Sequence, residues 1–378
     1  MKNNTSSEIC GHLRDLRMAS SAFFVYVGTY TGKGSKGIYL CRFDAASGAL
    51  ECVGKAAGRP NPTFLAIDPK GTHLYSVSEK RGFFGRRGSS VNAFALDPGT
   101  GTLTVINRQP SGGSGPCHVA VDREGRCVVV ANYASGSVAL FPVLDGGGLG
   151  EASDVRQHHG SSADHERQAG PHTHSVTFSP DNRFAFAADL GLDKIMIYRL
   201  DASDGKLVPH DPPWSAVRPG SGPRHFAFHP NSRFAYLVNE LSSTMTVFAY
   251  DAERAVLAEI QTLSALPADF KGASYCADVH VAASGRFVYA SNRGHDSIAV
   301  FRVDEESGMV SVVGHDSTEG KWPRSFVIDP TGDFLLAANQ DGDSIVVFRL
   351  SDGTGRLTPT GHTVSLSKPV CLKMVPAS

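Results

Sequence analysis

Apolar segments separated by polar turns recur along the chain in one pattern. The stretch "GPRHFAFHPNSRFAYLVNE", residues 222–240, contains an apolar segment, a Pro-containing turn and a second apolar segment that ends in Asn. The stretch "WPRSFVIDPTGDFLLAANQ", residues 322–340, repeats this order with a D-P-x-G turn. β-Branched and aromatic residues fill both segments and no helical period runs through them, so each stretch predicts a buried β-hairpin.

The hairpin belongs to a longer unit that continues with a polar turn, a third strand and a Gly-rich turn. Six complete units begin at Pro62, Pro116, Thr173, Pro223, Cys276 and Pro323. The second strands end at residues that recur every 47 to 57 positions, namely Ser78, Asn132, Asp189, Asn239, Asn292 and Asn339. A period of this length, with room for a fourth strand, is typical of β-propeller blades.

The two ends of the chain supply a seventh blade. Residues 24–50 carry the later strands of a unit without its first strand, and "KPVCLKMVPA" near the C-terminus has a first strand and nothing after it. Joining the two closes the ring and removes exposed sheet edges. The sequence therefore predicts an all-β fold, a seven-bladed β-propeller over residues 22–378. The N- and C-terminal segments share one blade, and residues 1–21 form a flexible tail.

Polar residues change from unit to unit at two places, while the apolar positions stay alike. The start of the first strand and the end of the second are cross-strand neighbours, and the first strand is innermost, so both places face one mouth of the propeller. Solvated strand ends are the alternative interpretation, but convergence on a concavity favours a binding site. The candidates for this mouth are Glu79, His118, His174, Arg224, His225, Glu240, His280, Arg293 and Arg324, with Gln340 in the Glu240 position.

The composition excludes several classes of protein. Of the 378 residues, 19% are charged and 41% hydrophobic, and the formal net charge is −1. Such a balance gives no general attraction to nucleic acid or to an acidic membrane. The sequence contains no apolar run of about 18 residues, so no membrane span is expected. We expect a soluble cytoplasmic monomer.

The seven cysteines include no C-x-x-C motif. Cys41, Cys52, Cys127 and Cys276 lie in or beside apolar segments. We interpret them as buried thiols rather than as a disulfide framework, which fits a reducing cytosol.

Three segments suggest other features but lack the supporting context. "GKGSKG", residues 32–37, matches a dinucleotide-binding pattern, but a strand follows it, which favours a hairpin loop. "QHHGSSADHERQAGPHTH", residues 157–174, holds five histidines without the spacing of a zinc site, and we interpret most of it as a mobile loop between blades. The insertion "KRGFFGRRGSS" after Glu79 is interpreted as a solvated hairpin tip. We predict no metal and no organic cofactor.

Long phrases of the chain resemble the lactonase family of seven-bladed β-propellers, from about residue 24 to residue 375. The most specific are "GPHTHSVTFSPDNRFAFAADLGLDKI", "GPRHFAFHPNSRFAYLVNELSSTMTVF" and "SNRGHDSIAVF". That family includes propeller-type 6-phosphogluconolactonases and fungal carboxy-cis,cis-muconate cyclases. In the cyclase branch the proposed catalytic group is a His, two Arg and a Glu. By motif these fall on His174 in "PHTHS", Arg224 in "GPRH", Glu240 in "VNE" and Arg293 in "SNRG".

The resemblance implies metal-independent hydrolysis of a small anionic sugar δ-lactone, above all 6-phosphoglucono-δ-lactone of the pentose phosphate pathway. Glu240 would then deprotonate the attacking water, Arg224 and Arg293 would stabilise the oxyanion, and His174 would protonate the ring oxygen. Burial and neighbouring arginines shift the pKa of Glu240 in opposite directions, so the sequence leaves the net direction open. Phosphate and hydroxyl contacts are expected from His118, His225, His280, Arg324 and Gln340.

Two alternatives remain at this point. A lactonising cyclase would use the same four residues to protonate an alkene carbon while a carboxylate adds. A non-catalytic propeller would bind a peptide or a partner domain, although the blades lack the WD dipeptide of many such scaffolds.

Overall fold

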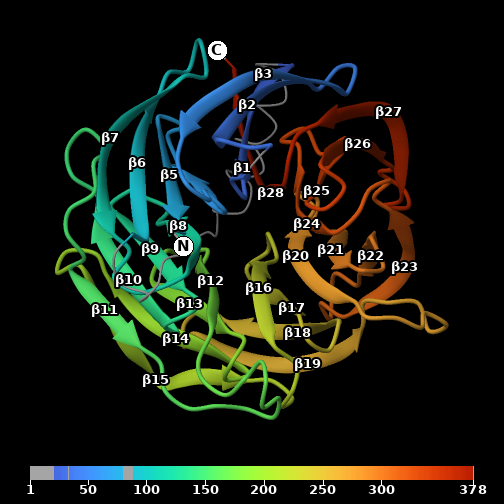
Figure 1. The fold of residues 1–378 in the computed structure, drawn as a ribbon. Coiled ribbons are helices and arrows are strands. Elements are labelled where there is room, and N and C mark those ends of the chain that lie inside the picture. The colour runs from blue at the N-terminus through green and yellow to red at the C-terminus, as the bar shows by residue number, and fades with distance from the viewer. Residues whose placement is uncertain (1–20, 33, 80–87, 378) are drawn as a thin grey trace, which may run out of the picture.

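The computed structural model describes residues 21–32, 34–79 and 88–377. These residues form seven four-stranded antiparallel sheets that stand in a ring around one axis (Figure 1). The seven-bladed β-propeller predicted from the repeats is therefore confirmed. The tail predicted over residues 1–21, apart from Ser21, and residues 80–87 of the insertion lie outside the described residues.

Each blade runs from an innermost strand beside the axis to an outer strand at the rim. The innermost strands are β4 (Leu65–Ile67), β8 (Pro116–Val121), β12 (Thr173–Phe178), β16 (Pro223–Phe228), β20 (Tyr275–Val281), β24 (Pro323–Ile328) and β28 (Pro369–Pro376). The second strands are β5 (His73–Ser78), β9 (Cys127–Asn132), β13 (Phe184–Asp189), β17 (Phe234–Asn239), β21 (Phe287–Arg293), β25 (Phe334–Asn339) and β1 (Ala22–Thr29).

The third strands are β6 (Ser90–Leu96), β10 (Ser137–Pro142), β14 (Lys194–Asp201), β18 (Thr244–Asp251), β22 (Ser297–Val303), β26 (Ser344–Leu350) and β2 (Gly37–Asp44). The outer strands are β7 (Leu103–Pro110), β11 (Asp154–Gln157), β15 (Lys206–Ala216), β19 (Val256–Ser264), β23 (Val310–Ser317), β27 (Leu357–Ser365) and β3 (Ala49–Gly58). The blade β28–β1–β2–β3 joins the two ends of the chain, as predicted.

Neighbouring blades are held together by buried apolar side chains and by a repeated tyrosine hydrogen bond. In one cluster, Val238 and Met245 of one blade pack with Cys276 and Ala290 of the next. Buried tyrosines of the second strands donate to glycine carbonyls in outer turns of the following blade: Tyr26 to Gly101 at 2.7 Å, Tyr75 to Gly147 at 3.0 Å and Tyr236 to Gly308 at 3.1 Å. Each such bond contributes about 1 kcal/mol.

The prediction for two of the cysteines is wrong. Cys41 and Cys52 are directly opposite each other on β2 and β3 and form a disulfide. Cys127 and Cys276 are buried free thiols, as predicted. The pairing depends on which residues face each other across two strands, and the apolar surroundings of each cysteine do not reveal that register.

No helix long and apolar enough to cross a membrane occurs in the described part of the chain. The "GKGSKG" segment connects β1 to the antiparallel strand β2, so its interpretation as a hairpin loop is confirmed outside Lys33, which is not described.

Candidate active site

A β-bulge interrupts the innermost strand at the same place in four blades. It lies near the end that faces the mouth, where the first strand pairs with the end of the second. A bulge leaves one residue unpaired and re-aims its side chain. The bulged residues are Cys117, His174, Arg224 and Arg324. One of the two variable sequence positions is therefore the one that the bulge releases from the ladder.

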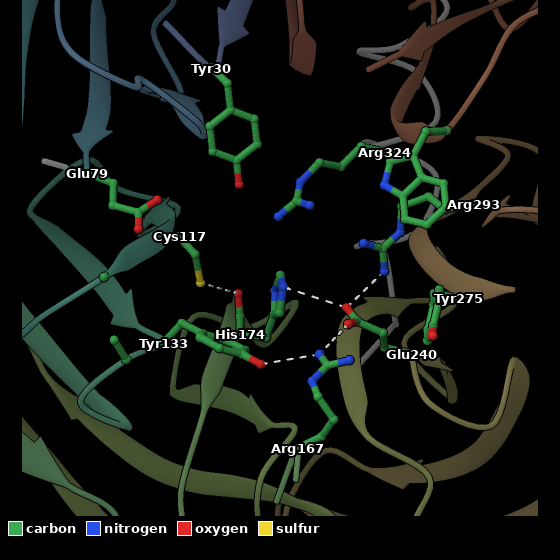
Figure 2. Close-up of a pocket in the computed structure, with 13 residues that line it drawn as sticks. Tyr30, Glu79, Cys117, Tyr133, Arg167, His174, Glu240, Tyr275, Arg293 and Arg324 are labelled. Carbon is green, nitrogen blue, oxygen red and sulfur yellow. Dashed lines mark hydrogen bonds and ion pairs between the residues drawn. The ribbon is translucent and has the colours of Figure 1, made fainter. Parts of the chain in front are cut away.

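Side chains from several blades line a pocket of about 540 Å³ at this mouth, called the mouth pocket below (Figure 2). Its charged lining residues are Glu79, Arg167, Glu240, Arg293 and Arg324. Ring side chains complete much of the wall, namely Tyr30, Tyr133, His174, Tyr275 and Trp322. Three cations face two carboxylates, so the pocket attracts a small anion.

Glu240 is the centre of an ion-pair cluster. Its Oε2 lies 2.9 Å from Nε of Arg224 and 2.9 Å from Nη2 of Arg293, and its Oε1 lies 2.8 Å from Nη2 of Arg167 (Figure 2 draws the last two pairs). The Arg293 guanidinium also donates to the Cys276 carbonyl at 2.9 Å, and Arg224 donates to the Ala277 carbonyl. The guanidinium groups of Arg224 and Arg293 are therefore fixed in orientation.

The charges of this cluster decide how Glu240 titrates. Burial alone would raise the pKa of Glu240, but Arg293 and Arg224 outweigh it and hold the pKa well below its usual range. Burial, with Arg293 as the next cause, lowers the pKa of Arg224 to about 9, so Arg224 remains a cation at neutral pH. The direction that the sequence left open is downward, and a carboxylate of this kind is a weak base.

His174 stands beside the cluster in its neutral form. Its Nε2 lies 4.0 Å from Oε2 of Glu240. Burial, followed by the nearby Arg224, lowers the pKa of His174 well below its usual value. A neutral imidazole beside a pocket that water can enter is able to accept a proton.

A layer of buried polar side chains lies under the mouth pocket. His225 is paired through Nδ1 with Oδ1 of Asp278 at 2.8 Å, and His280 Nε2 lies 3.4 Å from Oδ2 of the same carboxylate. The His118 ring lies 5.5 Å from that of His225, and the His174 ring lies at the same distance on the other side. Burial lowers the pKa of His225 to about 4 and that of His118 well below its usual value.

The predicted residues therefore occupy different levels. His174, Glu240, Arg293 and Arg324 line the mouth pocket. Arg224 is 2% exposed and lies beneath it, against Glu240.

The remaining residues predicted to contact phosphate or hydroxyl groups do not line the mouth pocket. His118 and His225 form the layer below. His280 is not among the described residues that line the mouth pocket: it lies five positions along β20 from Tyr275 and contacts Phe326. Gln340 lines an adjoining compartment instead. Cys117 does line the pocket, but burial raises the pKa of its thiol to about 12, so it stays protonated at neutral pH.

Arg167 is the main residue that the sequence analysis missed. It lies in the histidine-rich segment before β12, which we interpreted mostly as a mobile loop. The segment is anchored: His158 contacts Asp189 at 2.6 Å, and Gln168 donates to the Leu190 carbonyl at 2.7 Å. The chain reaches the mouth directly after this loop. The position of the loop beside the mouth was therefore the sequence signal that could have identified Arg167.

Two aromatic residues were also missed. Tyr275 begins β20, and Trp322 directly precedes β24; the Trp322 ring lies 5.7 Å from the Arg293 guanidinium. Both occupy the unit position one residue before Cys276 and Pro323. Extending the alignment by one position towards the N-terminus would have included them.

The histidines of this loop do not come together. His158 is held between Asp189 and Tyr198, while His172 stacks on Tyr133 with ring centroids 4.6 Å apart. Among the described residues, no three His, Cys, Asp or Glu side chains are placed to hold a metal ion.

The fold and the mouth pocket together define a class: a propeller with one cationic pocket for a small anion, in which a neutral histidine adjoins a carboxylate held by arginines. The family model described as "Lactonase, 7-bladed beta-propeller" matches residues 24–374. The chain belongs to this lactonase family of seven-bladed β-propellers.

Relatives of known name agree with this assignment. The chain is 43% identical to a 6-phosphogluconolactonase of Bacillus subtilis (strain 168) over 350 residues, which cover 93% of this chain and 97% of that protein. A putative 6-phosphogluconolactonase from Bacteroides fragilis has a solved structure that matches with a TM-score of 0.88 and 38% identity, covering 95% of this chain and 99% of the other. A periplasmic gluconolactonase of Pseudomonas aeruginosa matches with a TM-score of 0.89 and 36% identity, covering 95% and 100%.

Proposed function

We propose that the protein hydrolyses 6-phosphoglucono-δ-lactone to 6-phosphogluconate. Family membership and the 6-phosphogluconolactonase named above support the reaction. The observation that carries the proposal is the pairing of neutral His174 with a fixed Glu240–arginine cluster at 4.0 Å, inside a cationic pocket of the size of a sugar. Lactone opening needs a base, a stabilised oxyanion and a proton for the leaving oxygen, and this arrangement supplies all three.

His174 performs both proton transfers in this proposal. The attacking water gives a proton to the neutral imidazole as its oxygen bonds to the carbonyl carbon of the lactone. The resulting imidazolium then returns the proton to the ring oxygen as the bond between carbonyl carbon and ring oxygen breaks. Water is thus added across that bond, and the products are one carboxylic acid and one hydroxyl group. This role replaces the earlier assignment of the base to Glu240, because both carboxylate oxygens of Glu240 are already paired with arginines.

Arg293 stabilises the oxyanion in this proposal. It lines the mouth pocket, and its Nη2 is already committed to Glu240 and to the Cys276 carbonyl. The remaining face of a guanidinium oriented in this way can receive the negative charge that develops on the carbonyl oxygen. Glu240 is a positioning residue, because its Oε2 pairs with Arg293, and the buried Arg224 in turn holds the same oxygen of Glu240.

The finer expectations about the protein's surroundings follow from the substrate. A phosphorylated lactone is charged and does not cross a bilayer unaided, so we infer that the protein acts in the cytoplasm. We also infer a monomer, since Val53, Trp214 and Val312, three of the exposed large apolar residues, lie on the outer strands of three different blades. Size-exclusion chromatography with light-scattering detection measures the oligomeric state.

Acid release from the lactone tests the reaction. A pH-stat follows hydrolysis of 6-phosphoglucono-δ-lactone above its spontaneous rate for the wild type, for His174→Asn and for the control His362→Asn on outer strand β27. We expect His174→Asn to lose about 10²- to 10⁴-fold in turnover and the control to lose nothing. A wild type that does not exceed the spontaneous rate, or a His174→Asn variant of full activity, contradicts the proposal.

A further inference from the structure

A second compartment of about 620 Å³ opens beside the mouth pocket. Tyr30 and Arg324 line both spaces, so one small molecule can occupy the two together. The wall of this side compartment is built by Thr31, Gly32 and Gly34 of the β1–β2 loop, by Gln340 and by the turn before β28 that carries Ser367 and Lys368. The loop and the turn pack closely, because a Cβ on Gly34 would lie 2.5 Å from Oγ of Ser367.

The side compartment differs from the mouth pocket in charge. Its described lining residues include two cations, Arg324 and Lys368, and no carboxylate. The mouth pocket, in contrast, balances its arginines with Glu79 and Glu240. A dianionic group in the side compartment therefore meets two cations and no carboxylate among the described lining residues.

Arg324 stands on the boundary without an anionic partner among the described residues. Its guanidinium lies over the Tyr30 ring, 5.5 Å from the centroid, and Figure 2 shows it pointing towards the space between Tyr30 and His174. It makes no ion pair with any residue that the structure describes, unlike Arg167, Arg224 and Arg293. This cation is free to bind a ligand that spans the two spaces.

Lys368 supplies the second positive charge. Its Nζ lies 3.0 Å from Oδ1 of Asp341, and the Gln340 amide donates to the same oxygen at 3.1 Å. The Lys368–Asp341 pair is partly exposed, so a phosphate competes with Asp341 for the ammonium at little cost. The other amide atom, Oε1 of Gln340, is buried without a hydrogen-bond partner among the described residues and can accept from a hydroxyl group.

We propose that the side compartment is the phosphate subsite, with Lys368 and Arg324 as its cations and Lys368 as a residue that determines specificity for the phosphorylated lactone. The proposal rests on the proposed function and adds to it the location of the phosphate. The lactone ring occupies the mouth pocket next to His174, and the phosphate lies beyond Tyr30. A phosphate monoester carries a charge of about −1.5 to −2 at pH 7 and has three strong acceptor oxygens, which suit these two cations.

Paired substrates test the subsite. We compare kcat/KM for 6-phosphoglucono-δ-lactone and for glucono-δ-lactone in the wild type, in Lys368→Met and in Lys206→Met. Lys206→Met is the matched control. Lys206 is an exposed lysine on outer strand β15, and its Nζ lies 3.7 Å from Oδ2 of Asp204. Loss of one charged contact predicts a fall of about 10-fold for the phosphorylated lactone in Lys368→Met. The value for glucono-δ-lactone stays within about twofold, and the control changes neither. Equal losses for both lactones, or no loss for either, overturn the proposal.

A binding measurement separates this proposal from the proposed function. Calorimetry gives the Kd of 6-phosphogluconate and of gluconate for the same three proteins without any turnover. We expect the wild type to bind 6-phosphogluconate at least 10-fold more tightly, and Lys368→Met to lose most of that preference. If neither lactone is hydrolysed but the Lys368-dependent preference is present, the proposed function fails and the subsite stands. If the wild type binds both acids equally, the subsite is refuted whatever the activity.

Discussion

Replacing Glu240 by Gln removes the negative charge that pairs with all three arginines of the cluster, while keeping the shape of the side chain. The carboxylate is 6% exposed and lies within 2.9 Å of three guanidinium groups. In Glu240→Gln the positive charges of Arg167, Arg224 and Arg293 face one another without an anion between them, and two of these arginines, Arg224 and Arg293, are buried. The guanidinium groups then repel and move apart.

The size of the effect follows from the burial. Removing one partner of a buried ion pair costs about 3 to 5 kcal/mol. With an unfolding entropy of about 2.1 cal/mol/K per residue, 4 kcal/mol corresponds to a Tm lower by about 5 °C for a chain of this length. Activity should fall by at least about 10²-fold, because Arg293 is no longer held where the oxyanion forms.

Linkage adds a pH dependence with a definite sign. The pKa of Glu240 is lower in the folded protein than its usual value of 4.5, so its stabilisation is complete above about pH 5 and is lost as the pH falls below that value. The wild type should therefore lose more unfolding free energy between pH 5 and pH 3 than Glu240→Gln does.

Thermal unfolding and kinetics together test this reasoning. Glu259→Gln, an exposed and isosteric change on outer strand β19, is the control and should leave the Tm and kcat/KM as they are. Added formate distinguishes a positioning residue from a base, because a small external base restores activity only where a base was removed. An unchanged Tm in Glu240→Gln, or recovery of its activity with formate, refutes the role assigned here.

Four further predictions concern other parts of the account. Arg167→Met should lower kcat/KM by about 10-fold in steady-state assays, since the mouth pocket loses one of its cations. In a pH profile, kcat/KM should stay level well below pH 6.5, because His174 remains a neutral base until the pH falls to its lowered pKa. Gly294→Ala should lower both the Tm and kcat, because Gly294 adopts a φ of +104° directly after Arg293 and an added Cβ would lie 2.3 Å from a backbone carbonyl oxygen. Cys52→Ser should lower the unfolding free energy by about 2 to 3 kcal/mol in denaturant titrations, because it opens a disulfide that joins residues 11 positions apart.

The fold was predictable from the sequence because all blades pack in the same way and therefore carry similar residues at equivalent positions. A hairpin that buries both faces needs apolar residues at fixed places. A tyrosine that donates to a glycine carbonyl of the next blade, Gly308 in one case and Gly101 in another, also recurs at a fixed place because every pair of blades packs alike. The split blade was predictable because the N-terminal unit lacks its first strand and the C-terminal segment supplies one.

The candidate site was predictable only in part. Alignment of the repeats located His174, Glu240 and Arg293, because positions free of packing demands vary between blades. It could not show the β-bulge that re-aims His174, nor that Arg224 lies beneath the pocket, since both depend on local register.

The features that the sequence did not reveal have two physical origins. Arg167 lies in a loop that no other blade contains, so no repeat identified it. The sign of the Glu240 pKa shift and the Cys41–Cys52 disulfide depend on distances between strands, which composition does not contain. The direction of the pKa shift and the disulfide become evident once the structure shows which residues lie opposite each other.

A crystal structure with bound 6-phosphogluconate tests the central claim most directly. The account predicts the carboxylate of this product against Arg293 and His174 in the mouth pocket, with its phosphate beyond Tyr30 between Arg324 and Lys368. Binding of the sugar acid at the opposite end of the propeller or on its outer wall, with the mouth pocket holding only solvent, contradicts the account.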